Sequence, residues 1–109
     1  MTRSRLGPFQ QQMLYALLRL GEKAYGMRIW QELEERTGDR VTVGAVYATL
    51  ERLERKGLVS SRLAEPTPER GGRAKRYYSI TGVGVRALQD SERAFANLRT
   101  LVPRPGEEP

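Results

Sequence analysis

One stretch near the middle of the chain reads as a helix that leads directly into a basic hairpin. Residues 42–58 (TVGAVYATLERLERKGL) place Val46, Leu50 and Leu53 at the i, i+4, i+7 spacing of one buried helical face. Gly57 then supplies the residue type that most often ends a helix. Two strand-like runs joined by a loop follow it. This order predicts a winged helix, in which a packed helix is followed by a projecting hairpin.

The predicted hairpin carries basic residues at its tip. Its strand-like runs are 59–63 and 73–80, and alternate side chains along each run point to opposite faces. Lys75 and Tyr77 share the face opposite Tyr78, which we expect to pack inward. The connection PTPERGG is a loop by composition. The basic side chains at or beside that loop are Arg70, Arg73, Lys75 and Arg76. We therefore expect a cationic finger rather than a buried ribbon.

The outer face of the predicted helix begins with small residues. Thr42, Gly44 and Ala45 lie at its start, and a face of small side chains can approach DNA closely. Tyr47 could belong to the core, but other residues already define the buried face, so we favour an outward ring whose hydroxyl reaches a phosphate. Arg52 is a candidate reader of a base or a phosphate.

Charged residues of both signs follow on the same helix. Glu51 and Arg55 are spaced i, i+4 and can form an ion pair. A solvated, salt-bridged face is therefore as compatible with this part of the helix as contact with DNA.

Two helices are predicted before this unit. Gly7-Pro8 precedes the first, over about 9–20, because proline is favoured in a first helical turn. Its apolar stripe is wider than one core needs, so we expect it to contact two surfaces. The stripe comprises Phe9, Met13, Leu14, Ala16, Leu17, Leu18 and Leu20. A second helix, over about 25–36, turns Ile29, Trp30 and Leu33 inward and forms a helix-turn-helix with the third.

The last predicted helix covers 82–102 and is capped by Thr81. Five residues, four of them apolar, follow one another at alternating spacings of three and four, the a/d pattern of a helix-pairing seam. They are Leu88, Ser91, Phe95, Leu98 and Val102. Little core remains for a helix that follows the hairpin, so we expect a partner chain to cover it. Packing back on its own domain is the alternative.

The start of this helix also matches a nucleotide-binding motif. Residues Gly82 to Ala87 read G-x-G-x-x-A at a strand-to-helix junction. A dinucleotide-binding unit needs a second parallel strand and an acidic residue at its end, whereas this chain runs into proline. We therefore expect the glycines to let the helix start pack tightly against the domain.

The composition restricts the classes of function. A chain of 109 residues with 39% hydrophobic content is expected to form one small domain, whose core a dimer would extend. Lys and Arg number 19 against 13 Asp and Glu, a net charge of +6. This balance favours an anionic partner, nucleic acid before an acidic protein or an anionic membrane surface, although solubility alone can also explain it.

The residue types that are absent exclude several kinds of chemistry. The chain has no cysteine and no histidine, which rules out disulfides, thiol chemistry, zinc fingers and histidine bases. No cofactor and no metal are expected. No segment resembles a signal peptide or an apolar run of about 18 residues, so we expect a cytoplasmic protein that does not enter membranes.

Several segments together resemble one family of bacterial proteins. They are Tyr25-Gly26-Met27-Arg28-Ile29, the stretch 44–57 with Tyr47 and Leu53-Glu54, Gly71-Gly72-Arg73, and Tyr77-Tyr78-Ser79-Ile80-Thr81 followed by Gly84. In this order and spacing they are similar to the PadR family of transcriptional regulators, over about residues 7–101. The match is to the short subfamily, in which one C-terminal helix replaces a longer helical domain. The resemblance implies a homodimeric repressor that binds a near-palindromic DNA operator and is often relieved by a small molecule.

These considerations predict a mainly α fold with a small β-hairpin, organised in four parts. The parts are a basic N-terminal arm (1–6), a winged helix DNA-binding domain (7–81), a dimerisation helix (82–102) and a disordered tail (103–109). The predicted DNA-binding residues are Thr42, Gly44, Ala45, Tyr47, Arg52, Arg70, Arg73, Lys75 and Tyr77. The predicted dimerisation residues are Leu88, Ser91, Phe95, Leu98 and Val102.

Phe95 has a second interpretation. In multidrug-responsive relatives an aromatic residue near this position lines a pocket between the subunits, so the resemblance implies that Phe95 could stack a small planar effector. A plain hydrophobic seam residue is the simpler interpretation. Rival functions are an RNA-binding or architectural winged helix and a protein-interaction module. An enzyme is not expected, because no nucleophile–base or metal constellation exists in the sequence.

Overall fold

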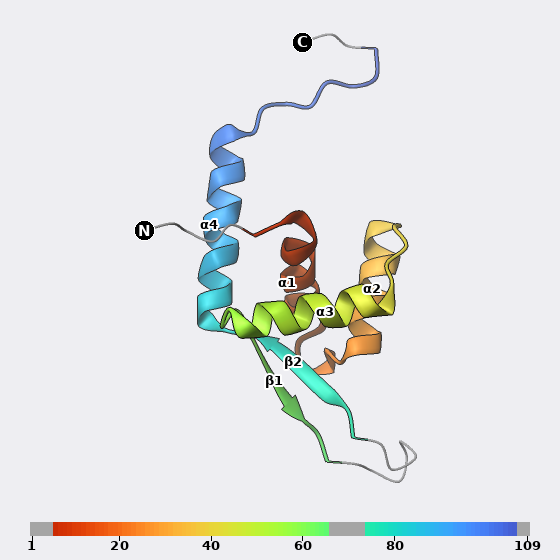
Figure 1. Cartoon of the computed structure of the whole chain (residues 1–109). Coiled ribbons are helices and arrows are strands. Elements are labelled where there is room, and N and C mark those ends of the chain that lie inside the picture. The colour runs from red at the N-terminus through yellow and green to blue at the C-terminus, as the bar shows by residue number, and fades with distance from the viewer. Residues whose placement is uncertain (1–5, 66–73, 107–109) are drawn as a thin grey trace.

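A computed structural model describes residues 6–65 and 74–106 and has the expected fold class (Figure 1). The described chain is mainly helical, with one antiparallel hairpin and a C-terminal helix. The elements in order are α1 (Pro8–Leu20), the short 3-10 helix η1 (Gly21–Lys23), α2 (Gly26–Thr37), α3 (Val43–Arg55), β1 (Val59–Leu63), β2 (Arg76–Ile80) and α4 (Gly82–Leu98). The prediction of a winged helix-turn-helix is confirmed.

The core lies where α1, α2 and α3 meet above the base of the hairpin. The predicted inner face of α3 is confirmed, because Val46, Leu50 and Leu53 have no exposed surface. The wide stripe of α1 divides: Leu14 is fully buried in its own domain, whereas Leu18 is 51% exposed. The apolar stripe of α1 is therefore wide because it includes an exposed leucine, Leu18, as well as residues buried in the core.

Local capping explains where α3 and α4 begin. The Thr42 hydroxyl accepts a hydrogen bond from the Ala45 N–H at 3.0 Å, and Thr81 does the same for the Gly84 N–H at 3.0 Å. Thr81 also donates its hydroxyl to the Gly57 carbonyl at 2.7 Å. This second bond joins the start of α4 to the turn after α3.

The hairpin is a two-stranded antiparallel ladder with an additional backbone contact at its edge. Arg62 pairs with Tyr77 across the strands. On the other edge of β2, Tyr25 forms a β-bridge with Tyr77, and the Tyr78 N–H donates to the Ala24 carbonyl at 2.8 Å. The segment before α2 therefore fixes the base of the hairpin to the helical body.

The predicted extent of the last helix is wrong by one turn. α4 ends at Leu98, and Arg99 is already extended, with φ −65° and ψ 132°. Pro103 disfavours a helix that continues through Val102, because its ring restricts the backbone at Val102 and would clash with a helical carbonyl of Arg99. Val102 thus lies in an exposed segment beyond the helix and cannot continue a helical seam.

Leu88, one of the predicted dimerisation residues, lies in the core of its own chain. Its side chain is 4% exposed, because the first half of α4 packs against α1 and β2. A Cβ atom on Gly84 would collide with the Leu58 carbonyl, which confirms the expected close packing at this glycine. A Cβ atom on Gly82 would have no neighbour within 4 Å, so the expectation is wrong for that glycine. Only the second half of α4 extends beyond the domain, as Figure 1 shows.

The two predicted terminal segments are only partly described. Residues 1–5 of the predicted arm and 107–109 of the predicted tail lie outside the described residues. Leu6 is buried against the core, and its carbonyl accepts a hydrogen bond from Gln11 Nε2 at 3.3 Å. Residues 103–106 are exposed and form neither helix nor strand.

Candidate nucleic-acid interface

The start of α3 presents a smooth, exposed surface. Gly44, Ala45 and Ala48 are all exposed, and a Cβ atom on Gly44 would have no neighbour within 4 Å. The Thr42 side chain is exposed too, but its hydroxyl oxygen already accepts the Ala45 N–H. Thr42 therefore fixes the first turn of the helix as well as bordering this surface.

Tyr47 lies on the flank of the same helix. Its ring is 42% exposed, in agreement with the predicted outward placement. The hydroxyl end of the ring lies against Gly26 at the start of α2, where any Cβ atom would collide with it. Tyr47 thus sits between the beginnings of α2 and α3, and glycine at position 26 is what makes room for it.

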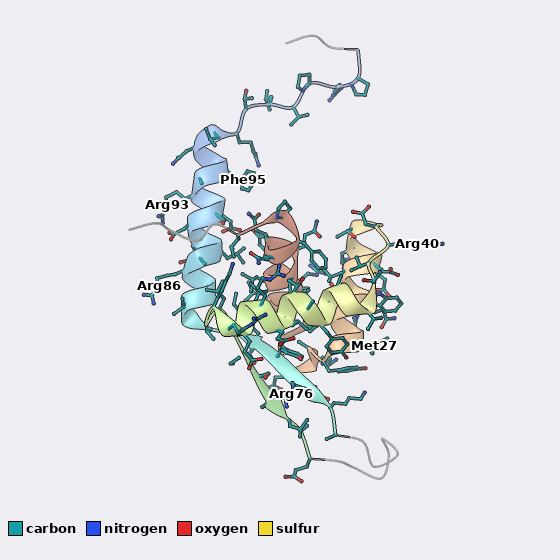
Figure 2. All side chains as sticks on the ribbon, viewed as in Figure 1. Met27, Arg40, Arg76, Arg86, Arg93 and Phe95 are labelled. Atoms are coloured by element: carbon teal, nitrogen blue, oxygen red, sulfur yellow. The ribbon has the colours of Figure 1, made fainter. Side chains whose placement is uncertain are left out.

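The charged side chains at the end of α3 form other contacts than the ion pair expected from the sequence. The Glu51–Arg55 ion pair is not among those formed within residues 6–65 and 74–106. Instead, Glu54 Oε2 accepts the Ser61 hydroxyl at 2.7 Å, and Ser61 Oγ accepts Arg76 Nη1 at 3.1 Å. These bonds hold Arg76 on the hairpin face that meets α3, and Figure 2 shows its place on β2. Arg52 and Arg55 remain exposed.

The opposite face of the hairpin carries Lys75 and Tyr77, the two predicted DNA-binding residues of the hairpin that the structure describes. Lys75 Nζ lies 3.8 Å from the centroid of the Tyr25 ring, and the Tyr25 and Tyr77 centroids are 5.7 Å apart with their planes at 70°. Arg62 Cζ lies 5.0 Å from the Tyr77 centroid. Lys75 and Tyr77 therefore share one face, as predicted. Two further members, Tyr25 and Arg62, were not predicted from the sequence.

Different signals could have identified these two residues. Arg62 alternates with the inward residues of its strand, so its face was predictable, and only the register was needed to place it beside Tyr77. Tyr25 carries no local signal, because its position depends on a contact with β2 about 50 residues further along the chain. The predicted DNA-binding residues Arg70 and Arg73 lie outside the described residues.

Tyr78 anchors the inner face of β2. The side chain is 7% exposed, and burial is the main reason that the pKa of its phenol is raised above the usual 10.0. With Tyr78 packed inward, the alternate residues of the strand must face out, as the sequence pattern predicted.

Three other arginines surround a buried carboxylate between α1 and α2. Glu32 is 4% exposed and accepts Arg19 Nε at 2.7 Å and Arg36 Nε at 3.2 Å, with Arg28 Nη2 at 3.4 Å. The hydrogen bond from Arg19 is the main cause that holds the pKa of Glu32 below its usual 4.5. These cations are partly compensated inside the domain, whereas those of α3 and the hairpin face outward.

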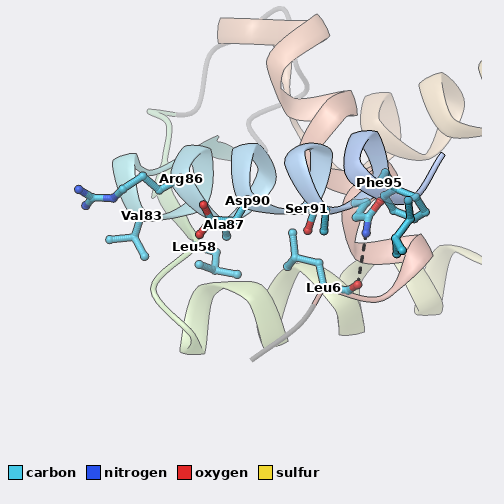
Figure 3. A pocket seen from close by; sticks show the side chains of 11 residues that line it. Leu6, Leu58, Val83, Arg86, Ala87, Asp90, Ser91 and Phe95 are labelled. Carbon is cyan, nitrogen blue, oxygen red and sulfur yellow. Dashed lines mark hydrogen bonds between the residues drawn. The ribbon is translucent and has the colours of Figure 1, made fainter. Parts of the chain in front are cut away.

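The second half of α4 presents a separate apolar surface. Phe95 is 60% and Leu98 83% exposed, and Figure 2 shows Phe95 on the side of α4 that faces α1, with Arg93 on the other side. A groove of 680 Å³ runs along α4 beside Phe95, with Leu6 and Leu58 on its other wall (Figure 3). Of the predicted dimerisation residues, Ser91, Phe95 and Leu98 therefore line one groove.

Comparison with known proteins agrees with this geometry. The family described as "Transcriptional regulator PadR-like family" matches residues 13–90. "Transcriptional regulator Rv3488" of Mycobacterium tuberculosis is 40% identical over 78 residues, which are 70% of this chain and 66%, slightly less than two thirds, of that protein. No helix among the described residues is long and apolar enough to cross a membrane.

Solved structures show the same fold. A PadR-like transcription factor from Bacteroides fragilis is 30% identical, with a TM-score of 0.65 over 83% of this chain and 85% of that one. A PadR-like transcriptional regulator from Bacillus cereus superposes with a TM-score of 0.68 over 83% and 82% of the two chains; at 22% identity this likeness concerns the fold alone. On the family match and these similarities, the chain belongs to the PadR-like family of transcriptional regulators, which are DNA-binding proteins and not enzymes.

Proposed function

We propose that the protein is a homodimer that represses transcription by occupying a near-palindromic DNA operator. The proposal rests on one observation: two exposed surfaces, the start of α3 and the outer face of the hairpin, lie on the same domain. The small-residue start of α3 suits close approach to base edges in a major groove, and the hairpin cations suit the phosphate backbone. A regulator of this kind acts on the chromosome, so we expect it in the cytoplasm.

Dimerisation is supported by the second half of α4. Phe95 and Leu98 are large apolar residues that their own domain leaves exposed, and they line a groove that also contains Leu6, Leu58 and Val83. Covering them with a second copy would bury surface that is costly to leave in water. Leu88 has no part in this proposal, because it is buried in its own chain.

A two-fold dimer sets the geometry of the operator. Two α3 helices related by such an axis would enter successive major grooves about 34–36 Å apart, so the half-sites should lie about one helical turn from centre to centre. An insertion of about half a turn between the half-sites should abolish tight binding. Retained affinity would indicate a single-site reader.

The test begins with the DNA that the protein itself selects. Sequencing of fragments that copurify with the protein should give a palindromic consensus, and filter binding then compares that duplex with a random duplex and single-stranded RNA. Preference for the palindrome supports the proposal. Equal binding of both duplexes would indicate an architectural protein, and preference for RNA or failure to bind any nucleic acid would favour the rival functions.

Leu98→Glu tests the dimer directly. It places a charge on a side chain that is 83% exposed, so the fold of the monomer should be unaffected. Light scattering should show a dimer for the unmodified protein and a monomer for the variant. The variant should also lose operator binding. A monomeric unmodified protein at micromolar concentration would contradict the proposal.

Relief by a small molecule is a second part of the proposal. A flat, apolar ligand beside Phe95 could regulate only if it binds the DNA-competent and released states with different affinity. Operator DNA must then weaken the ligand by the same factor. Planar dyes titrated against free and operator-bound protein, and against Phe95→Ala, test this. Equal affinity in both states would leave Phe95 as a packing residue.

A further inference from the structure

Four side chains on the outer face of the hairpin alternate between cations and rings. In spatial order they are Lys75, Tyr25, Tyr77 and Arg62, and we name this set the cation–ring row. Adjacent members are separated by 3.8, 5.7 and 5.0 Å, measured from the charged atom or ring centroid to the neighbouring ring centroid. Within the described part of the chain, Tyr25 thus lies beside Lys75 and Tyr77 beside Arg62, and the two rings meet edge to face.

The backbone holds this row together from three segments. Tyr25 lies just before α2 and forms a β-bridge with Tyr77 on β2, and Tyr77 is the cross-strand partner of Arg62 on β1. Lys75 is fixed by its carbonyl, which accepts the Ala64 N–H at 2.8 Å. None of these bonds uses a side chain. The rings can therefore be changed without removing the contacts that place the hairpin.

The side chain of Tyr25 is not needed to start α2. Tyr25 occupies the N-cap position but makes no side-chain capping bond there. Its ring instead lies between the ends of Lys75 and Tyr77. The placement of this ring is explained by its contacts with the hairpin rather than by the stability of the helix that it precedes.

We propose that Tyr25 is a positioning residue for DNA binding, whose ring holds the Lys75 ammonium ready for a backbone phosphate, and that Tyr77 does the same for Arg62. The inference rests on the proposed DNA-binding function. A lysine side chain loses much rotamer freedom when it is fixed, and a ring that fixes it beforehand removes that cost from the binding step. A ring face occupies one side of the ammonium and leaves N–H donors for a phosphate oxygen.

The Tyr25 ring could instead hinder DNA binding, and the direction of the change in affinity distinguishes the two possibilities. A ring that held Lys75 away from DNA would have to release it on binding, and removal of that ring would then tighten the complex. The proposal requires weaker binding instead. Phosphate contacts carry no sequence information, so an arbitrary duplex suffices as the probe.

The experiment is a double-mutant cycle read by fluorescence anisotropy. The probe is a labelled duplex of about 30 base pairs, three helical turns, at low salt. Tyr25→Phe keeps the ring and should bind like the unmodified protein. Tyr25→Leu should weaken binding about two- to fivefold, the range for one exposed cation–π contact. In a Lys75→Met background, Tyr25→Leu should have no further effect.

Three outcomes would overturn the inference while leaving the proposed function in place. They are equal binding by Tyr25→Leu and Tyr25→Phe, the same loss from Tyr25→Leu in the Lys75→Met background, and tighter binding by Tyr25→Leu. Absence of duplex binding by the unmodified protein would be a different failure, because the proposed function itself would then fall. The cycle of Tyr77→Leu with Arg62→Met provides the matched second test.

A readout without DNA separates positioning from general damage to the fold. In the free protein, NMR should show the side-chain methylene protons of Lys75 shifted by the ring current of Tyr25. The shift should persist in Tyr25→Phe and vanish in Tyr25→Leu, while the amide spectrum of α3 stays unchanged. A Lys75 shift that is insensitive to Tyr25→Leu would overturn the inference.

Discussion

The phenol of Tyr15 donates a 2.6 Å hydrogen bond to Glu92 Oε2 and so joins α1 to α4 across 77 positions of the sequence. The bond lies where α4 leaves the domain, between the buried Leu88 and the exposed Phe95. Its acceptor is charged, which makes it stronger than a bond between neutral groups. It therefore restrains the direction in which the second half of α4 projects.

The first prediction concerns the ionisation of Tyr15. The hydrogen bond to Glu92, with a smaller contribution from burial, raises the pKa of Tyr15 from 10.0 to about 12. A folded pKa above the unfolded value means that the bond stabilises the protein below pH 10 and that this stabilisation is lost as the pH rises through about 12. Titration followed by NMR of the tyrosine rings should show Tyr15 ionising late, and Glu92→Gln should lower its pKa. Ionisation of Tyr15 near pH 10 in the unmodified protein would contradict the bond.

The second prediction separates folding from DNA binding at Gly44. A Cβ atom there meets nothing within 4 Å, so Gly44→Ala should raise the free energy of unfolding by up to about 1 kcal/mol through helix propensity. The same methyl group would stand on the surface proposed to meet base edges and should weaken operator binding. Chemical denaturation and filter binding measure the two effects. If the affinity of Gly44→Ala for the operator were unchanged, this turn of α3 would not be the part that contacts DNA.

The third prediction compares two glycines of one helix. Gly84→Ala should destabilise the protein by about 1–3 kcal/mol, because its Cβ atom would collide with the Leu58 carbonyl, which is backbone and cannot rotate away. Gly82→Ala is the control, since a Cβ atom there has no neighbour within 4 Å. Thermal unfolding of both variants should show a loss only for the first. Equal stability would mean that α4 can shift away from the hairpin at no cost.

The fourth prediction concerns acid stability and Glu32. Its pKa is lowered, mainly by the hydrogen bond from Arg19, so the carboxylate stabilises the fold above pH 4.5 and this stabilisation is lost as the pH falls through the lower folded pKa. Glu32→Gln should cost about 1–2 kcal/mol at neutral pH, a modest value because the arginines are partly exposed and screened by water. The difference between variant and unmodified protein should shrink in acid. Glu35→Gln, at an exposed position of the same helix, should have little effect at any pH.

The sequence by itself determined the elements whose signals are local. The 3.6-residue spacing of Val46, Leu50 and Leu53 identified the buried face of α3, and the Thr81 hydroxyl marked the start of α4 correctly. The alternation of residues 74–80 placed Tyr78 on the inner face of the hairpin and Lys75 on the opposite face. Such patterns are readable because side chains only a few positions apart on one helix or strand fix which face is apolar.

Only the tertiary structure decided which surface covers an apolar stripe. Leu88 and Leu98 belong to one pattern along α4, yet the first is buried by its own domain and the second is exposed, because the domain extends along only half of the helix. The cation–ring row likewise depends on the pairing of Tyr25 with β2. The spacing of apolar residues shows which face of a helix is apolar. Which segment covers that face depends on how distant parts of the chain pack together.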